Sequence, residues 1–153
     1  MKKKLFLSFI VSAVILTNCW SGNPDSSGLK SIAGREVSQM TNEDFKKLIF
    51  NYELNKEWKY EGTKPAIIDF YADWCAPCKQ LSPLVEEIAN EYAGKIIVYK
   101  VDTMKEKYLA TKLGITGLPT LLFIPANGKP SVSMGFIPKE SLEKAIHDVL
   151  LIK

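Results

Sequence analysis

Two kinds of hydrophobic spacing alternate along the chain and predict alternating helices and strands. A first helix follows Thr41, an N-cap residue with Asp44 three positions on. Its apolar residues recur at helical spacing and are Phe45, Leu48, Ile49 and Tyr52. Polar residues 53–64 then indicate a helix end and a loop. Ala66–Tyr71 is a short, almost continuous apolar run, which is typical of a central strand buried on both faces.

The next segments repeat this alternation. A second helix ends at Gly94, and its helically spaced apolar residues are Leu81, Leu84, Val85, Ile88 and Tyr92. We expect a strand at residues 96–101 and a short helix at residues 104–113 that Gly114 closes.

The last third predicts two strands and a helix. Strands at residues 120–124 and 132–135 form a hairpin with a turn at Asn127 and Gly128. Pro138 opens the last helix, whose inner face carries Leu142, Ala145, Ile146, Val149 and Leu150. With a weak strand near Val37, the order begins as βαβ units and ends as ββα. The chain therefore predicts an α/β fold with a mixed sheet and helices on both faces.

The N-terminus has a different character. Lys2, Lys3 and Lys4 precede an apolar run at residues 5–16. A basic start and a short apolar region predict an export signal at residues 1–18, because the run is too short for a comfortable membrane span. Residues 19–34 are rich in Ser, Gly, Asn and Pro and predict a flexible tether, so the domain occupies residues 35–153.

Cys19 directly follows the export signal. Residues 16–19, Leu-Thr-Asn-Cys, resemble a bacterial lipobox, in which cleavage leaves a lipidated cysteine, although Asn18 departs from the usual small residue. Ordinary cleavage after Ser21 is the alternative and would remove Cys19. Both interpretations place the protein outside the cytoplasm, in the periplasm or cell envelope, either free or anchored by lipid.

Export also changes the charge balance. The 153-residue chain has 20 basic and 17 acidic residues, and three of the basic ones lie in the export signal. Its removal would leave 17 of each, so the mature domain has no basic excess that would favour nucleic acid.

Cys75 and Cys78 are the candidate reactive residues. A zinc site needs about four ligands, whereas this pair has no second pair and the single histidine, His147, lies in the last predicted helix. Haem attachment needs a histidine after the second cysteine, where Lys79 stands. A structural bridge would close too small a loop to restrict the unfolded chain much. A redox-active disulfide between Cys75 and Cys78 is the favoured interpretation, and exported compartments permit it.

The position of this pair predicts its mechanism. Cys75 falls where a helix begins, so free backbone N–H groups and the helix dipole stabilise its thiolate. Pro77 suits the first helical turn. Cys78 lies inside the helix, and we expect it to be the more buried cysteine. Cys75 would therefore attack a substrate disulfide, and Cys78 would resolve the mixed disulfide.

The chain resembles the thioredoxin family over residues 36–151. The resemblance rests on Asp69 to Lys79 (DFYADWCAPCK), Pro83, Lys100, Asp102, and Gly114 to Thr120 (GITGLPT). It implies a thioredoxin fold with a central mixed five-stranded sheet flanked by four helices. Residues 51–64 are longer than the usual connection in the family.

The resemblance also implies roles for residues outside the cysteine pair. Asp69 would be a buried carboxyl that accepts the proton of Cys78, rather than an acid at a sheet edge. Lys100 on the neighbouring strand would tune its pKa. Pro119 would be a cis proline, and the Leu118 backbone would pair with an extended substrate. The remaining substrate-binding residues would be Trp74, Ala76, Pro77, Gly117 and Gly135.

The residues between the cysteines bear on the direction of electron flow. Ala76-Pro77 differs from the common Gly-Pro of thioredoxins by one methyl group, and lacks the Pro-His of strongly oxidising relatives. We therefore expect a protein-disulfide reductase. A disulfide-forming oxidase or isomerase, and a thioredoxin-fold assembly or binding subunit, remain alternatives. The expected partners are disulfide-containing clients and a membrane or soluble electron donor. We expect no cofactor, no metal, membrane contact only through an N-terminal lipid, and a monomer.

Overall fold

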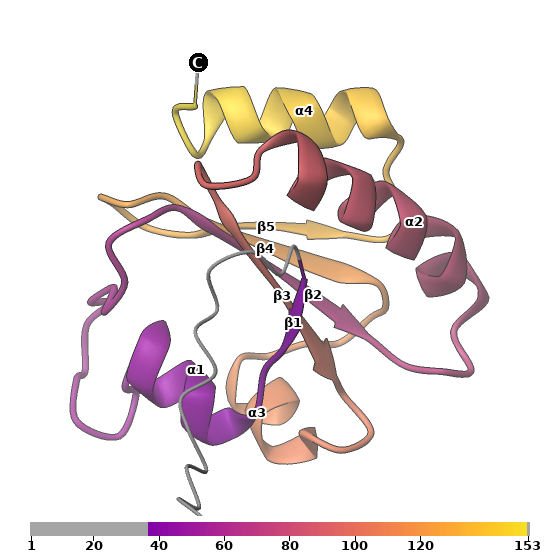
Figure 1. Ribbon diagram of the computed structural model, residues 1–153. Coiled ribbons are helices and arrows are strands. Elements are labelled where there is room, and N and C mark those ends of the chain that lie inside the picture. Colours follow the sequence, from indigo (N-terminus) through magenta and orange to yellow (C-terminus); the bar gives the residue numbers. More distant parts are fainter. Residues whose placement is uncertain (1–36, 153) are drawn as a thin grey trace, which may run out of the picture. The chain divides into compact units, whose positions relative to one another are not determined.

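The computed structural model describes residues 37–152, and its elements follow the predicted order (Figure 1). The strands are β1 (Ser38–Gln39), β2 (Ala66–Tyr71), β3 (Ile97–Asp102), β4 (Thr120–Ile124) and β5 (Ser131–Met134). The helices are α1 (Asn42–Leu48), α2 (Ala76–Glu91), α3 (Lys107–Lys112) and α4 (Lys139–Asp148). The export signal, the tether and Cys19 lie outside the described residues.

The five strands form one mixed sheet in the order β1-β3-β2-β4-β5. β3 pairs in parallel with both β1 and β2, whereas β4 pairs antiparallel with β2 and with β5. Helical crossovers join the parallel strands, as parallel pairing requires. The carboxyl ends of β2 and β3 therefore lie at the same edge of the sheet as the start of β4.

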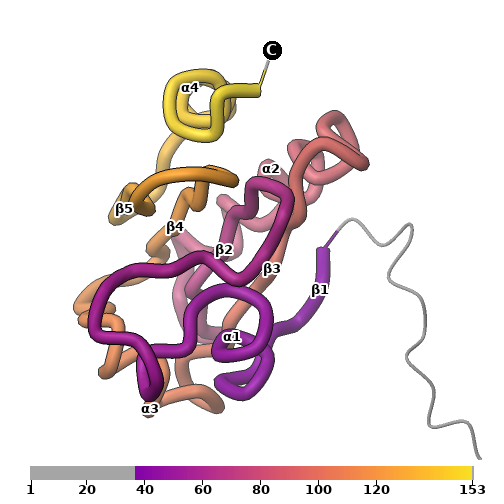
Figure 2. The backbone as a smooth tube through the Cα atoms, turned by 90° about the vertical axis from the view of Figure 1, so that its left-hand side faces the viewer, coloured from indigo at the N-terminus to yellow at the C-terminus, as the bar shows by residue number. Residues whose placement is uncertain are grey.

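Helices cover both faces of the sheet (Figures 1 and 2), and each face has its own hydrophobic core. On one face, α2 and α4 cover the sheet with residues that include Leu81, Val85, Leu142 and Ile146. On the other face lie α1 and α3, whose buried residues Phe45 and Leu109 pack with Ile68, Phe70 and Leu122 of the sheet. The period-2 alternation along β2 thus sends Ile67 and Ile68 into different cores.

The start of α1 is the predicted capping box, but its end differs from the prediction. The Asp44 N–H donates to the Thr41 hydroxyl, and the Thr41 N–H donates to the Asp44 carboxylate at 3.1 Å. The helix ends at Leu48, which is exposed rather than on the inner face. Tyr52 lies in the turn that follows and donates its hydroxyl hydrogen bond to the Asn42 side chain.

Replacing Thr41 with alanine is expected to destabilise the protein by about 1 kcal/mol, because it removes a hydroxyl that satisfies a helix N–H. Urea denaturation monitored by circular dichroism measures this change. Thr41→Ser, which keeps the hydroxyl, is the matched control and should lose much less. An alanine variant as stable as the serine variant would contradict the capping role.

Further boundaries were predicted imperfectly, and one of them is that of α3, which covers Lys107–Lys112 rather than residues 104–113. The β4–β5 connection spans residues 125–130 rather than a tight Asn127-Gly128 turn, although Gly128 does adopt a positive φ of 110°. Strand β3 begins and ends one residue later than expected, and β5 one residue earlier. The long segment before β2 packs through its aromatic residues, with Phe50 and Trp58 rings 5.0 Å apart. Within residues 37–152 no helix is long and apolar enough to cross a membrane.

Candidate functional site

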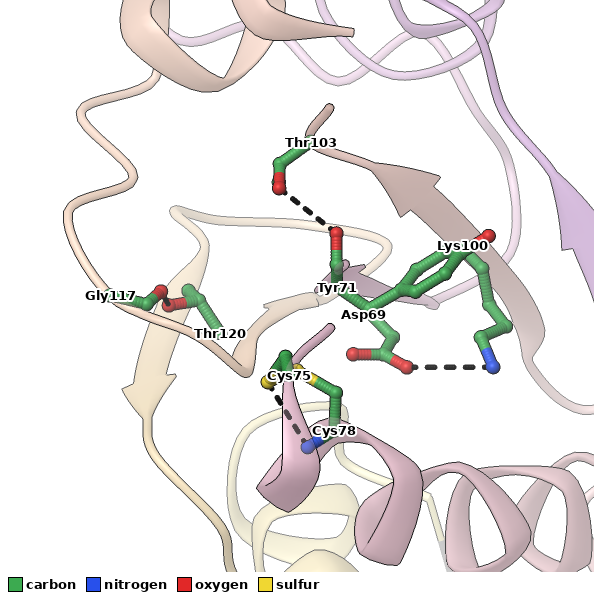
Figure 3. Close-up of a disulfide and its surroundings, with 8 residues drawn as sticks. All are labelled: Asp69, Tyr71, Cys75, Cys78, Lys100, Thr103, Gly117 and Thr120. Atoms are coloured by element: carbon green, nitrogen blue, oxygen red, sulfur yellow. Dashed lines mark hydrogen bonds and ion pairs between the residues drawn. A yellow bond between two sulfur atoms is a disulfide. The ribbon is translucent and has the colours of Figure 1, made fainter. Parts of the chain in front are cut away.

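Cys75 and Cys78 lie where the chain passes from β2 into α2 (Figure 3). Cys75 is the N-cap of α2, with φ −81° and ψ 105°, and its Sγ accepts a hydrogen bond from the Cys78 N–H at 3.2 Å. The two sulfur atoms form a disulfide with an S–S distance of 2.01 Å. The predicted helix start is therefore present, and it aims helical N–H groups at the Cys75 sulfur, where they favour a thiolate.

The two cysteines do not differ in burial, contrary to our expectation for Cys78. Each is 3% exposed, and both pack with Ala72 in a small cluster against Tyr71 and Leu118. In the disulfide form both cysteines share the same packed surroundings. The neighbouring Trp74 side chain is 69% exposed.

Asp69 occupies a position on β2 that an apolar residue would normally fill. It lies opposite Leu121 of β4 and Lys100 of β3, on the sheet face that α2 covers. Its side chain is 1% exposed, and within the described part of the chain neither carboxyl oxygen has a hydrogen-bond partner. Burial raises its pKa from 3.8 to about 6, and the Lys100 charge opposes this rise. The carboxyl is thus an acid–base group poised near neutral pH.

Lys100 is held beside Asp69 by three contacts. Its Nζ lies 4.0 Å from Asp69 Oδ2 and 4.9 Å from the centre of the Tyr71 ring, and it donates a hydrogen bond to the Ser82 hydroxyl. Figure 3 shows the Lys100 ammonium group pointing at the Asp69 carboxyl group. Sequence reasoning missed Ser82, because one serine on the outer part of a helical pattern carries no distinguishing signal.

A small pocket is lined by both Lys100 and Cys78. Its volume is about 200 Å³, and its lining residues are Tyr71, Ala72, Asp73, Cys78, Lys79, Ser82 and Lys100. Water that enters this pocket can therefore reach the Cys78 and Lys100 side chains.

The Leu118–Pro119 peptide bond is cis, as the family resemblance implies. The Pro119 carbonyl accepts a hydrogen bond from the Gly135 N–H at 2.8 Å, and the Thr120 hydroxyl donates to the Gly117 carbonyl at 2.7 Å. Within residues 37–152, the Leu118 backbone N–H and carbonyl take part in no hydrogen bond. These two groups are therefore free to pair with an added strand.

A larger groove of about 410 Å³ opens next to the Leu118 backbone, which we call the shelf together with Pro119. Three predicted substrate-binding residues line it, namely Trp74, Gly117 and Leu118. Sequence reasoning missed the rest of the lining, which is Thr103, Lys107, Ala110, Thr111, Ile115 and Thr116. Ala76 and Pro77 are exposed at the start of α2, outside this lining.

The arrangement supports thiol–disulfide exchange. It combines a disulfide at a helix N-terminus, a buried carboxyl with a raised pKa and a shelf of free backbone groups. Among residues 37–152, no cluster of three or more His, Cys, Asp or Glu side chains could hold a metal ion.

Comparison with known proteins agrees with this geometry. The family model described as Thioredoxin matches residues 36–148. A thioredoxin of Borreliella burgdorferi is 50% identical over 109 residues, which are 71% of this chain and 93% of that protein. A thioredoxin of Pyropia yezoensis is 35% identical over 111 residues, or 72% of this chain and 94% of that protein.

A solved structure shows the same fold. The crystal structure of chloroplastic thioredoxin z superposes with a TM-score of 0.65 at 26% sequence identity, over 78% of this chain and 98% of that chain.

Proposed function

Because the chain belongs to the thioredoxin family, and so is a thiol–disulfide oxidoreductase, we propose that it acts specifically as a protein-disulfide reductase. The observation that carries this proposal is the Cys75–Cys78 disulfide at the start of α2, with the buried Asp69 carboxyl on the sheet face beneath that helix. Ala76 and Pro77, the two residues between the cysteines, are uncharged, so they add no charge to the stabilisation that the helix terminus gives the Cys75 thiolate.

The reaction begins with the dithiol form of the protein. The Cys75 thiolate attacks one sulfur of a client disulfide, the client S–S bond breaks, and the released client thiolate takes a proton from solvent. Cys78 then gives its proton to the Asp69 carboxylate and attacks the Cys75 sulfur. The mixed disulfide breaks, and the second client thiolate leaves and is protonated. Two electrons have passed to the client, and Cys75 and Cys78 are joined.

Within this reaction the other residues have defined roles. Lys100 lowers the Asp69 pKa by its charge and so keeps the carboxyl able to accept a proton. The free Leu118 backbone groups hold the client segment beside the cysteines, with Pro119 and Gly135 supporting that shelf. Trp74, Ala76, Pro77 and Gly117 form the surrounding contact surface.

We further propose that the protein works in the cell envelope. The basic and apolar residues 1–18 support export, and Cys19 would carry the lipid if the lipobox is used. A reductase in that location needs a membrane or soluble donor that returns two electrons and two protons to Cys75 and Cys78 after each cycle.

The reduction potential tests the direction of electron flow. We expect a value near that of thioredoxin, about −270 mV, from equilibration of the cysteine pair with glutathione followed by alkylation of free thiols. Ala76→Gly, which restores the common thioredoxin loop, is the matched comparison. A potential near that of a strong oxidase, about −120 mV, would instead favour the disulfide-forming alternative.

A further inference from the structure

Ser82 lies on α2 one helical turn after Cys78, and both residues line the small pocket of the site. The Lys100 ammonium group donates a hydrogen bond to the Ser82 hydroxyl, and this hydroxyl donates one to the Glu86 carboxylate at 3.3 Å. A serine hydroxyl has one hydrogen to donate and two lone pairs that accept, so both bonds form together. The bond to Glu86 therefore leaves the lone pairs of Ser82 for Lys100.

Lys100 needs such a partner because two environments compete for its ammonium group. Its side chain is 13% exposed, and it lines the pocket of about 200 Å³ together with Ser82. An ammonium group is strongly hydrated and its stem is flexible, so water in this pocket competes with Asp69 for it. The distance of 4.0 Å between Lys100 Nζ and Asp69 Oδ2 is too long for a hydrogen bond. The Ser82 hydroxyl thus supplies the directional bond that this ion pair lacks.

Lys100 is the charged group whose position matters most to Asp69. The other ionisable groups around the ion pair come from α2 and from the end of β2, and they are Tyr71, Asp73, Cys78, Lys79 and Glu86. Asp73 and Lys79 are exposed and opposite in charge, so solvent screens both. The Lys100 charge opposes the rise in the Asp69 pKa that burial causes. A group that fixes the Lys100 ammonium therefore acts on Asp69 as well.

We propose that Ser82 is a positioning residue that holds the Lys100 ammonium group beside the Asp69 carboxyl and thereby keeps Asp69 ready to accept the Cys78 proton. The inference rests on the proposed function, in which Asp69 accepts that proton. Serine carries no charge, so Ser82 acts through the position of Lys100. Without the hydroxyl, the ammonium group moves toward the water of the pocket and its field at Asp69 weakens. The carboxyl then keeps its own proton up to a higher pH.

The pH profile of the resolving step in Ser82→Ala tests the proposal. Alanine favours helices, so this variant retains α2. The inflection that belongs to Asp69 should move to higher pH by about half a pH unit, and by less than in Lys100→Gln, which removes the charge itself. Ser82→Thr keeps the hydroxyl and should restore the wild-type inflection. Gln80→Ala, at an exposed position of α2 outside the pocket lining, is the matched control and should leave it in place.

A double variant shows whether Ser82 acts through Lys100. In Ser82→Ala with Lys100→Gln, the inflection should lie where Lys100→Gln alone places it, because no ammonium group is left to hold. Three results would overturn the inference: an unchanged inflection in Ser82→Ala, a shift to lower pH in that variant, or an equal shift by Ser82→Ala with and without Lys100.

NMR titration of the Asp69 carboxyl carbon in the disulfide form separates the inference from the proposed function, because it requires no exchange reaction. The Ser82→Ala, Ser82→Thr and Lys100→Gln variants should titrate in the same order as their inflections. Titration in this order, together with failure of the wild type to reduce insulin disulfides, would refute the proposed function alone. A wild type that reduces insulin, with Asp69 titrating identically in Ser82→Ala, would refute the positioning role alone.

Discussion

Replacing Cys75 with serine is expected to lower the rate of insulin disulfide reduction by at least about a thousandfold, because a hydroxyl at neutral pH is a far weaker nucleophile than a thiolate. Cys75 is the N-cap of α2, and its sulfur accepts a hydrogen bond from the Cys78 N–H, a position that favours the thiolate. The assay follows precipitation of the reduced insulin chains with dithiothreitol as the electron donor.

Cys78→Ser is the matched control for this experiment. It keeps the attacking thiolate and removes the resolving thiol, so it should also stop turnover but accumulate a mixed disulfide between Cys75 and the client. Mass spectrometry of the adduct identifies the cysteine involved. An adduct on Cys78 in the Cys75→Ser variant, or undiminished turnover in that variant, would contradict the assignment of roles.

Replacing Asp69 with asparagine is expected to slow the resolving step by about a hundredfold, the usual contribution of a general base. The Asp69 pKa is about 6, so the wild-type resolving rate should fall as the pH decreases through that value. The asparagine variant should lack this inflection. Rapid-quench measurement of the mixed disulfide at several pH values checks the prediction, and Lys100→Gln should move the inflection to higher pH. An inflection that survives in Asp69→Asn would assign it to another group.

The raised pKa of Asp69 also predicts how the free energy of unfolding depends on pH. In the unfolded chain Asp69 loses its proton near pH 3.8, whereas the folded protein retains it up to about pH 6. The native state binds more protons in this interval, so the contribution of Asp69 to the free energy of unfolding falls as the pH rises, by about 3 kcal/mol in total. Urea denaturation of the disulfide form should show Asp69→Asn gaining stability relative to the wild type between pH 4 and pH 8. A constant difference across this range would contradict the raised pKa.

The fold was largely readable from the sequence because its apolar spacing is regular. The run in β2 and the helical faces of α2 and α4 each fill a core, so local pattern and tertiary burial agree. The predicted end of α1 was wrong because Leu48 and Tyr52 fit helical spacing. In the structure the chain turns at Ile49, and the Tyr52 hydroxyl donates a hydrogen bond to the Asn42 side chain. Tertiary contacts of this kind leave no trace in periodicity.

The candidate site could be predicted only in part, because tertiary contacts also determine which side chains meet there. Cys75, Cys78 and Pro119 stand in motifs with a local physical meaning. Ser82 contributes through the hydrogen bond that it accepts from Lys100, a contact that bridges distant parts of the chain. Such contacts depend on how strands are paired, and the hydrophobic pattern does not specify side-chain positions at that level.

The strand pairing also places one end of the sheet far from the cysteines, where a surface linkage or a tag can be attached. Ala66 of β2 lies opposite Ile97 and Ile124, at the other end of the sheet from the cysteines, and residues 125–130 leave β4 there. The five residues of β4 put this connection about 17 Å from the Pro119 shelf, at about 3.3 Å per residue. Lys129 on this connection is exposed, so a surface linkage or an affinity tag placed there would hold the protein with its reactive face turned outward. Clients trapped by the Cys78→Ser variant could then be collected from a column without obstruction of the groove.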